Sequence, residues 1–586
     1  MNEIVWRLWA AASAIGFGLA WCIAAADVLP GAEGPSLPWP SDVPGFVAPA
    51  AGEHPRLFFR KGDLAALRAK AETPEGLAIV ARLRKLLDGA EGNAMPKQHR
   101  PEDEPYGDRS QPVALPEGSY TMSHAAGYGL LYQLTGDRRY ADLGRECFEW
   151  AWRGIRDRDA KGRYAWNDPC GALRAGVALG WYAVGYDLCY DGWDEAFRVK
   201  AAQAIQNYNE GPFQSLPELA RGARHHPGSN HWGMQVGGAA LALLAIKDDP
   251  GVDHEKIAAL LDQNAKCMIR NMTEGFGDGG FFAEGDGTGS MSSHIVFLPA
   301  LQAWRTAGGK DFIAPRPNAQ WMALRWFAQA VSRDGKADFW PQRGGYPHNI
   351  WARGDISGAG YFAIALGVVG PQAQAGVIGY YDHFFKAADE KAGTPFDTVS
   401  PYPHHAVLSL VNWPVGLAGS DPAGAWPLAF HDSKYQFFLI RNRYRDEDDI
   451  VITHLGANAR GFIRAPADRQ IQIRALGKKF GWGRLPGKIT AFQTGDDGST
   501  VVQTDSDCFA VDFSGAAKLD ALLALTGDHA DRALPVSTAE IGGRTVSFLM
   551  LGRNKEQLPE LRVEGDRALI GEQTVRLEQG RVVFGR

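Results

Sequence analysis

The stretch Ser229-Asn230-His231-Trp232 stands directly before an apolar run, residues 234–246, that predicts a buried helix. A basic turn, Arg224-His225-His226, precedes it. The amide of Asn230 can hydrogen-bond a carboxylate, and the imidazole of His231 can exchange a proton near neutral pH. This arrangement at a helix entrance suits the binding of an acidic sugar. The alternative is structural, with Asn230 capping the helix and His231 lying on the surface.

Helical periodicity extends to both sides of this stretch, from His54 to about Phe385. Short turns rich in Gly, Asp and Pro separate the periodic segments and predict antiparallel helical hairpins. The expected helices include residues 123–134, 140–152, 173–190, 195–209, 234–246, 254–271, 294–306, 319–331 and 361–385. Three long loops, 211–228, 275–293 and 334–360, interrupt the pattern, and such loops usually carry function.

After about Lys434 the apolar residues alternate with period two, which predicts an antiparallel β-sandwich of about 150 residues. The expected strands are 435–441, 449–455, 470–476, 488–493, 500–504, 508–513, 544–551 and 574–584. The sequence thus predicts a signal peptide (1–26), a linker (27–52), a helical catalytic domain (53–386), a Pro-rich connector (387–433) and a β-sandwich domain (434–586).

The N-terminus has the pattern of an export signal. Arg7 precedes an apolar run, residues 8–26, and Ala24-Ala25-Ala26 forms a small-residue cleavage site. We therefore expect a periplasmic or secreted protein that has no membrane contact after cleavage. The run is also near the length of a short membrane span, so an uncleaved anchor is the alternative.

Charge and cysteine usage restrict the partners. The formal net charge of −6 supplies no field for a polyanion, so nucleic acid is not an expected partner. An acidic ligand would have to be held in a local basic cleft. The six cysteines show no CxxC pair and no metal-ligand spacing. A disulfide between Cys170 and Cys189 and a set of buried free thiols are both open.

A helical-hairpin domain followed by a β-sandwich resembles the heparinase II/III-like polysaccharide lyases and their alginate-lyase relatives. Four strings carry the resemblance, and they occur in the family's order: His54-Pro55-Arg56-Leu57-Phe58, Tyr186-Asp187-Leu188-Cys189-Tyr190-Asp191 with Trp193, Asn230-His231-Trp232, and Gly280-Phe281-Phe282-Ala283-Glu284-Gly285-Asp286-Gly287. The resemblance implies an incomplete (α/α) toroid followed by an antiparallel β-sandwich. It also implies cleavage of a uronic-acid polymer by β-elimination.

Such a lyase needs a group that neutralises the uronate carboxylate, a base near C5 and an acid for the leaving O4. It requires no metal and no organic cofactor. The resemblance places Asn230 as the neutraliser and His231 as the base or a second neutraliser. Arg224, His226 and Trp232 are expected to contact substrate on the same rim. A solvated basic turn is the alternative for the first two.

Glu284 is expected to contact substrate, and it would form an acid pair with Asp286. Family members commonly carry a catalytic Tyr a few residues beyond this acidic-Gly step. This chain has Thr288, Ser290 and His294 there instead. The identity of the proton-transferring residue is therefore open.

The loop 342–355 supplies the other candidates. Tyr346 fits the missing acid or a combined acid and base, and His348 is a second candidate base. Arg343 and Arg353 are expected to bind carboxylates of the substrate. The alternative is a rigid loop in which Arg353 pairs with Asp355.

Three other features of the sequence give weaker evidence for a functional role. Tyr120, His124 and Tyr128 favour core packing over a place in a cleft. The adjacent His404 and His405 are too few for a metal site. Family members often place a His-x-His-type segment early in the sandwich, but residues 461–468 of this chain contain no His. No metal site is predicted.

The sequence therefore predicts an exported lyase whose partner is an acidic polysaccharide or oligosaccharide. Three alternatives remain. A glycoside hydrolase would use two facing carboxylates, Glu284 with Asp286 or Asp355. A uronate epimerase begins with the same abstraction of the C5 proton. A non-catalytic glycan-binding protein would keep the cleft without the chemistry.

Overall fold

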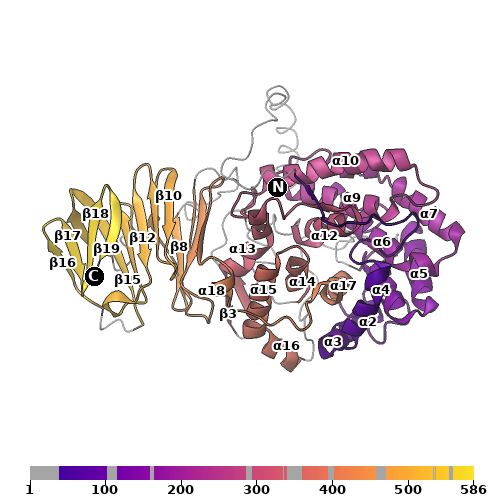
Figure 1. Ribbon diagram of the computed structural model, residues 1–586, viewed down its shortest axis with the longest axis horizontal. Coiled ribbons are helices and arrows are strands. Elements are labelled where there is room, and N and C mark those ends of the chain that lie inside the picture. The colour runs from indigo at the N-terminus through magenta and orange to yellow at the C-terminus, as the bar shows by residue number, and fades with distance from the viewer. Residues whose placement is uncertain are drawn as a thin grey trace, which may run out of the picture. The chain divides into compact units, whose positions relative to one another are not determined.

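Helices dominate the chain as far as residue 425, and strands dominate from residue 429 onward (Figure 1). This computed structural model describes residues 39–101, 115–158, 164–169, 171–285, 293–333, 336–339, 359–392, 402–456, 470–531, 534, 536–553 and 558–585. These residues belong to one unit, Pro38–Arg586. In the part of the chain so described, no helix has the length and apolar character needed to cross a membrane.

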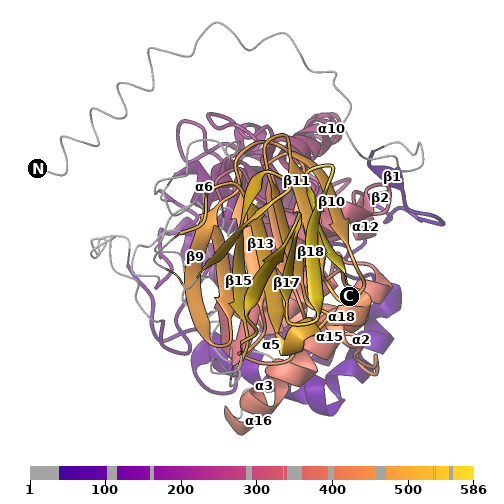
Figure 2. The same cartoon turned by 90° about the vertical axis from the view of Figure 1, so that its left-hand side faces the viewer.

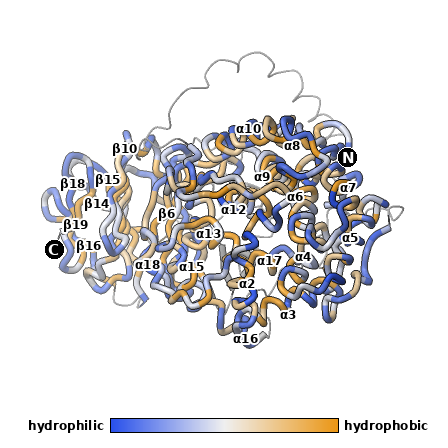
Figure 3. Tube along the Cα trace, turned by 45° about the vertical axis from the view of Figure 1, so that its right-hand side comes forward, coloured by the Kyte–Doolittle hydropathy of each residue, from blue (hydrophilic) through white to orange (hydrophobic). Residues whose placement is uncertain are grey.

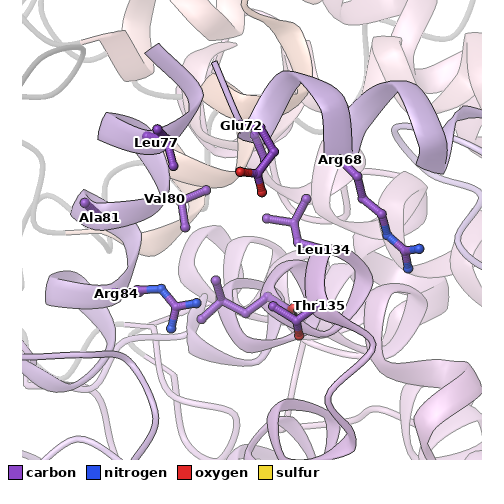
Figure 4. Close-up of a pocket in the computed structure, with 10 residues that line it drawn as sticks. Arg68, Glu72, Leu77, Val80, Ala81, Arg84, Leu134 and Thr135 are labelled. Atoms are coloured by element: carbon purple, nitrogen blue, oxygen red, sulfur yellow. Dashed lines mark hydrogen bonds between the residues drawn. The ribbon is translucent and has the colours of Figure 1, made fainter. Parts of the chain in front are cut away.

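Two apolar helices form the centre of the helical part. They are α6 (Ala172–Cys189) and α9 (Asn230–Ile246), and nearly every residue in them is buried. Such all-round burial is typical of helices that are apolar on every face, as the colouring of α9 in Figure 3 illustrates. A Cβ at Gly238 would overlap the backbone of Gly176, so the two helices touch backbone to backbone.

The other helices surround or extend this pair. They are α2 (Leu64–Ala71), α3 (Pro74–Asp88), α4 (His124–Thr135), α5 (Arg138–Trp152), α7 (Glu195–Gln206), α8 (Leu216–Ala220), α10 (His254–Arg270), α12 (Leu298–Ala307), α13 (Trp321–Gln329), α14 (Ala359–Leu366), α15 (Pro371–Phe384), α16 (Lys386–Ala392), α17 (Pro403–Asn412) and α18 (Pro422–Ala425). Two further turns are of the π type, η3 (Asn271–Gly275) and η4 (Ser293–Phe297).

A buried ionic network joins the first two of the four family strings. His54 Nδ1 lies 2.7 Å from Asp187 of α6, and His54 Nε2 lies 3.0 Å from Asp249, beyond the end of α9. Arg56 and Tyr186 also bond Asp249, each at 2.7 Å. Burial raises the pKa of Asp249, but the hydrogen bond from His54 and the charge of Arg56 outweigh it and lower that pKa. This network ties the N-terminal segment to the central helices.

The strands form three larger antiparallel sheets (Figure 2). One has the order β5 (Ala429–Asp432), β6 (Phe437–Arg441), β7 (Val451–Leu455), β8 (Gln470–Ala475), β9 (Lys478–Arg484). The second has the order β10 (Ile489–Thr494), β11 (Thr500–Thr504), β12 (Cys508–Asp512), β13 (Ala521–Thr526), β15 (Arg544–Leu551), β14 (Ser537–Ile541). The third has the order β16 (Leu561–Glu564), β17 (Arg567–Ile570), β18 (Gln573–Glu578), β19 (Arg581–Gly585).

The second sheet is covered on both faces. One apolar cluster joins it to the first sheet and includes Phe438, Trp482 and Phe509. A separate cluster joins its other face to the third sheet, through residues such as Phe548 and Val575. The expected sandwich is therefore three sheets deep rather than two. Short strand pairs also occur among the helices: β1 (Ser41–Asp42) with β2 (Lys310–Asp311), and β3 (Ala330–Arg333) with β4 (Lys336–Phe339).

Asp432, at the end of β5, joins the first sheet to a loop of the helical part. Its carboxylate accepts hydrogen bonds from the backbone N–H groups of Gly279, Phe281 and Tyr435, at 3.0–3.1 Å. A Cβ on Gly277 would overlap this carboxylate. Burial raises the pKa of Asp432 to about 6. The loop that leads to Glu284 is thereby attached to the sheet.

The structure refines several of the sequence expectations. Residues 361–385 form two helices, α14 and α15, because Gly370-Pro371 starts a new helix. Of the two alternatives left open for the cysteines, the free thiol holds for Cys189, which is buried 3.6 Å from the carbonyl of Ala125 and forms no disulfide. Cys170 itself lies outside the described residues. The expected connector, 387–433, includes α17 and α18, and α17 is buried along most of its length.

Candidate functional site

The N-terminus of α9 presents the amide and the imidazole that the sequence singled out. Ser229 is the capping residue, and its hydroxyl accepts a hydrogen bond from the backbone N–H of His231 at 3.3 Å. The helix begins four residues before the apolar run because of this cap. Asn230 is the first helical residue, so its side chain is not needed as the cap.

Asn230 is instead bound to Glu284, 54 residues further along the chain. The backbone N–H and the side-chain amide of Asn230 donate to the same carboxylate oxygen, at 3.0 and 2.5 Å. Both residues are more than 90% buried. A carboxylate at a helix N-terminus is stabilised by the helix dipole and by the backbone donors that point at it.

The loop that presents Glu284 is held by its own backbone. Phe276 and Phe282 form a β-bridge, and the N–H of Ala283 donates to the carbonyl of Gly275 at 2.8 Å. The N–H of Gly285 donates to the carbonyl of Phe282 at 2.8 Å. Gly285 has a positive φ of +83°, which glycine adopts readily. Glu284 therefore sits on a fixed turn.

Hydrogen bonds and packing also fix the basic turn that precedes α9. Asn271 donates to the carbonyl of Pro227 at 2.8 Å, and the N–H of Ser229 donates to the carbonyl of His226 at 2.9 Å. Gly222 has a positive φ of +64°, and a Cβ there would overlap the ring of Trp232. These contacts fix the direction in which the turn meets the helix.

Within this turn, His225 is the residue that reaches His231. The two rings stack with their centroids 4.2 Å apart. Gln235, fully buried one turn further along α9, has its amide nitrogen 2.9 Å from Nδ1 of His225. With the amide in this orientation its N–H donates to Nδ1, and neutral His225 then carries its proton on Nε2.

The electrostatics keep His231 neutral. Burial is the largest cause that lowers its pKa, and His225, Arg174 and Arg224 lower it further, to about 3. Burial and the neighbouring basic groups also lower the pKa of His225. At neutral pH the site therefore contains two neutral imidazoles near positively charged side chains, and these charges favour the binding of an anion.

Some of these residues were not anticipated from the sequence. Arg174 lies in the first turn of α6, and its charge acts on His231 from the neighbouring helix. Gln235 lies inside the apolar run and gave no signal there. The sequence prediction favoured His226 over His225 for substrate contact. In the structure His226 and Arg224 are exposed on the turn, and only His225 stacks on His231.

Trp232 lies in the core, away from this surface. Its indole N–H donates to the carbonyl of Cys267 at 2.9 Å, and its side chain is 4% exposed. It supports the site from beneath and is not placed for contact with a ligand. The remaining candidates, Tyr346, His348, Arg343 and Arg353, lie outside the described residues, as do Asp286 and Asp355.

The less favoured clusters are structural. His124 is fully buried between Thr121 and the carbonyl of Leu87, and burial lowers its pKa to about 4. Tyr120 bonds Tyr182 at 2.6 Å within the core. His404 is buried and stacks on Trp181. In the described part of the chain, no group of three or more His, Cys, Asp or Glu side chains is arranged to hold a metal ion.

Comparisons with known proteins find similarity only among solved structures. No protein-family model matches the chain, and no curated protein matches it. The chain is similar in fold to a structure of heparinase III, with 10% identity, a TM-score of 0.40 and coverage of 89% of this chain and 90% of the other. It is also similar to a mutant of the heparan sulfate lyase HepC from Pedobacter heparinus, with 11% identity, a TM-score of 0.38 and coverage of 90% and 94%.

A further heparinase III structure shows 10% identity and a TM-score of 0.36 over 79% of this chain and 83% of the other. Heparinase III thus occurs repeatedly among the structures that this chain resembles.

Proposed function

We propose that this protein is an exported polysaccharide lyase that cleaves a uronic-acid-containing polymer by β-elimination. The observation that carries the proposal is the pairing at the start of α9. There Asn230, bound to Glu284, directly precedes His231, whose imidazole stacks on His225 and is kept neutral near positively charged side chains. A neutral imidazole can accept a proton, and these charges favour a carboxylate on the sugar that supplies the proton.

In the proposed reaction, Asn230 binds the uronate carboxylate. One N–H of its amide donates to Glu284, no other described residue accepts from this amide, and the second N–H is proposed to bind the substrate. His231 removes the C5 proton or, if another base acts, helps to neutralise the carboxylate. The C5–H electron pair forms the C4–C5 double bond, the C4–O4 bond breaks, and an acid protonates the leaving O4.

The acid is the part of the proposal that rests on sequence alone. We assign it to Tyr346, with His348 as a second base and with Arg343 and Arg353 binding neighbouring carboxylates. Arg224 and His226, both exposed on the basic turn, are proposed to meet the polymer at the rim. The helical part is proposed to be the incomplete (α/α) toroid that the family resemblance implies.

Glu284 is proposed to hold Asn230 rather than to bind substrate directly. Its carboxylate is buried and already accepts two hydrogen bonds from one residue. A glycoside hydrolase needs two carboxylates that face the scissile bond, and this one faces Asn230. The geometry at Glu284 therefore favours elimination over hydrolysis.

The test is to offer the purified protein a panel of polyuronates and to follow two signals together. A lyase produces ultraviolet absorbance from the new C4–C5 double bond in step with new reducing ends. Reducing ends without absorbance would indicate a hydrolase. Inversion at C5 without chain cleavage, detected by NMR in heavy water, would indicate an epimerase.

A further inference from the structure

A cavity of about 350 Å³ lies at the ends of α5 and α7, apart from the Asn230 site. Its size is at the lower end of the range for small-ligand sites. Its lining includes Trp152, Trp166 and Tyr208 together with Lys200, Asn209 and Glu210. Aromatic rings next to amide, carboxylate and ammonium groups can bind a sugar ring. The aromatic rings contact its C–H faces, and the polar groups hydrogen-bond its hydroxyls.

Two of the aromatic residues that line this cavity, Trp166 and Tyr208, belong to the core and are only 5% and 3% exposed, so this part of the lining is rigid. Trp166 packs edge-on against Tyr208, with centroids 5.1 Å apart, and Tyr208 donates to the backbone carbonyl of Trp166 at 3.1 Å. Trp152 is half-buried and lies edge-on to Trp166 at 6.5 Å. A wall whose rings hold one another loses little conformational entropy when a ligand binds.

The polar rim has unused hydrogen-bonding groups. The side-chain oxygen of Asn209 accepts from the N–H of Gly211 at 3.3 Å, and no described residue accepts from its amide nitrogen. Lys200 is exposed, with its ammonium 4.6 Å from the ring centroid of Trp152. No described carboxylate lies within ion-pair distance of this ammonium. Lys200 is therefore available for the acidic group of a ligand.

A further aromatic residue, Phe213, lies along the chain between the cavity and the candidate site. Phe213, three residues after Glu210, is 37% exposed, and the guanidinium of Arg224 lies 5.5 Å from its ring centroid. Arg224 in turn acts electrostatically on His231. Exposed aromatic and basic groups thus continue from the cavity toward the start of α9.

We propose that this cavity is an accessory saccharide subsite that binds an acidic pyranose ring of the same polymer, away from the bond that is cleaved. Lys200 meets the acidic group, Asn209 and Glu210 meet hydroxyls, and Trp152 packs against the ring. The identity of the polymer rests on the proposed lyase function, but the subsite itself does not.

The experiment compares Lys200→Glu and Asn209→Ala with the wild-type protein. Both residues are exposed, so the fold should tolerate the changes. We expect the KM for a long polyuronate to rise about fivefold in Lys200→Glu, the effect of losing an exposed ion pair and gaining a repulsion. The kcat, and the KM for the shortest cleavable oligosaccharide, should not change. Lys256→Glu, an exposed lysine in the first turn of α10, is the matched control.

Equal KM values for the long polymer in wild type and both variants would overturn the subsite. If the wild-type protein cleaves no polyuronate, the lyase proposal fails, and binding of polyuronate followed by tryptophan fluorescence decides the subsite separately. Weaker binding in Lys200→Glu than in Lys256→Glu would then support it, and equal binding would refute it.

Discussion

At the scale of single residues, the account depends on one carboxylate oxygen of Glu284 that accepts two hydrogen bonds from Asn230. We expect Glu284→Gln to retain activity within about tenfold of wild type, because its amide oxygen can still accept from both donors. Glu284→Ala leaves the Asn230 side chain without its partner. For that variant, kcat should fall about 100-fold, the usual effect of a misplaced stabilising donor.

Steady-state kinetics of the two variants, with melting temperatures measured in parallel, check this prediction. If Glu284 instead acted as a general acid, Glu284→Gln would be as inactive as Glu284→Ala. A purely structural role would lower the melting temperature of Glu284→Ala while leaving kcat unchanged.

The ionisation of His231 is a second prediction at this scale. Burial and the nearby cationic groups lower its pKa to about 3, so its imidazole should remain neutral down to about pH 4. An NMR titration of the histidine ring protons, assigned with His231→Asn, measures this directly. A midpoint near 6.5 would mean that His231 is solvated and not enclosed.

At the residue level, the sequence predicted where Asn230 and His231 lie in the fold, because that signal is local. The position of Asn230 and His231 at a helix entrance followed from the apolar run that comes after them. The contact with Glu284 crosses 54 residues and could not be read from spacing. Choosing His225 over His226 required the direction of a turn in which Arg224 has a positive φ of +72°.

At the scale of elements, the loop that carries Glu284 depends on its attachment to the first sheet. Gly277 has no Cβ, which leaves room for the carboxylate of Asp432. We expect Gly277→Ala to lower the free energy of unfolding by about 1–3 kcal/mol, since the backbone or Asp432 must move. Its activity should fall as well, because the displaced loop carries Glu284.

Gly424→Ala is the matched control, since nothing lies within 4 Å of a Cβ at that position and its φ is not positive. Urea denaturation of both variants measures the difference. Equal stabilities for the two would show that the contact between Gly277 and Asp432 does not hold the loop.

Elements were predicted well where periodicity was clean, but several strands were missed. The helix expected at 254–271 matches α10, whose apolar residues face one side. Strand β13, Ala-Leu-Leu-Ala-Leu-Thr, was not predicted, although its neighbour β12, which is also buried at every residue, was. Its sheet is covered on both faces, which an argument based on a two-sheet sandwich did not anticipate.

At the scale of the whole molecule, two histidines, the buried His124 and the partly exposed His405, should make the fold sensitive to acid. Burial lowers the pKa of His124 and of His405 to about 4. Between about pH 6.5 and 4 the unfolded chain binds protons that the folded chain does not, so stability falls as the pH falls. Each histidine contributes up to about 1.4 kcal/mol per pH unit in this window.

Urea denaturation at a series of pH values tests this expectation. His405→Gln removes one titrating group. Below pH 6.5, the free energy of unfolding should then depend less steeply on pH, by the amount that corresponds to about one bound proton. An unchanged slope would mean that His405 is not kept neutral in the folded protein. Stability that rises on acidification through this window would contradict the sign of the effect.

Asn230 is proposed to stabilise the negative charge that develops on a uronate during elimination. This role can be tested by following the ultraviolet absorbance of the unsaturated product in wild type and in Asn230→Ala on the same polyuronate. Wild type should form product steadily, and Asn230→Ala should form it at least about 100-fold more slowly. Equal rates in the two proteins, or no unsaturated product from wild type on any polyuronate, would contradict it.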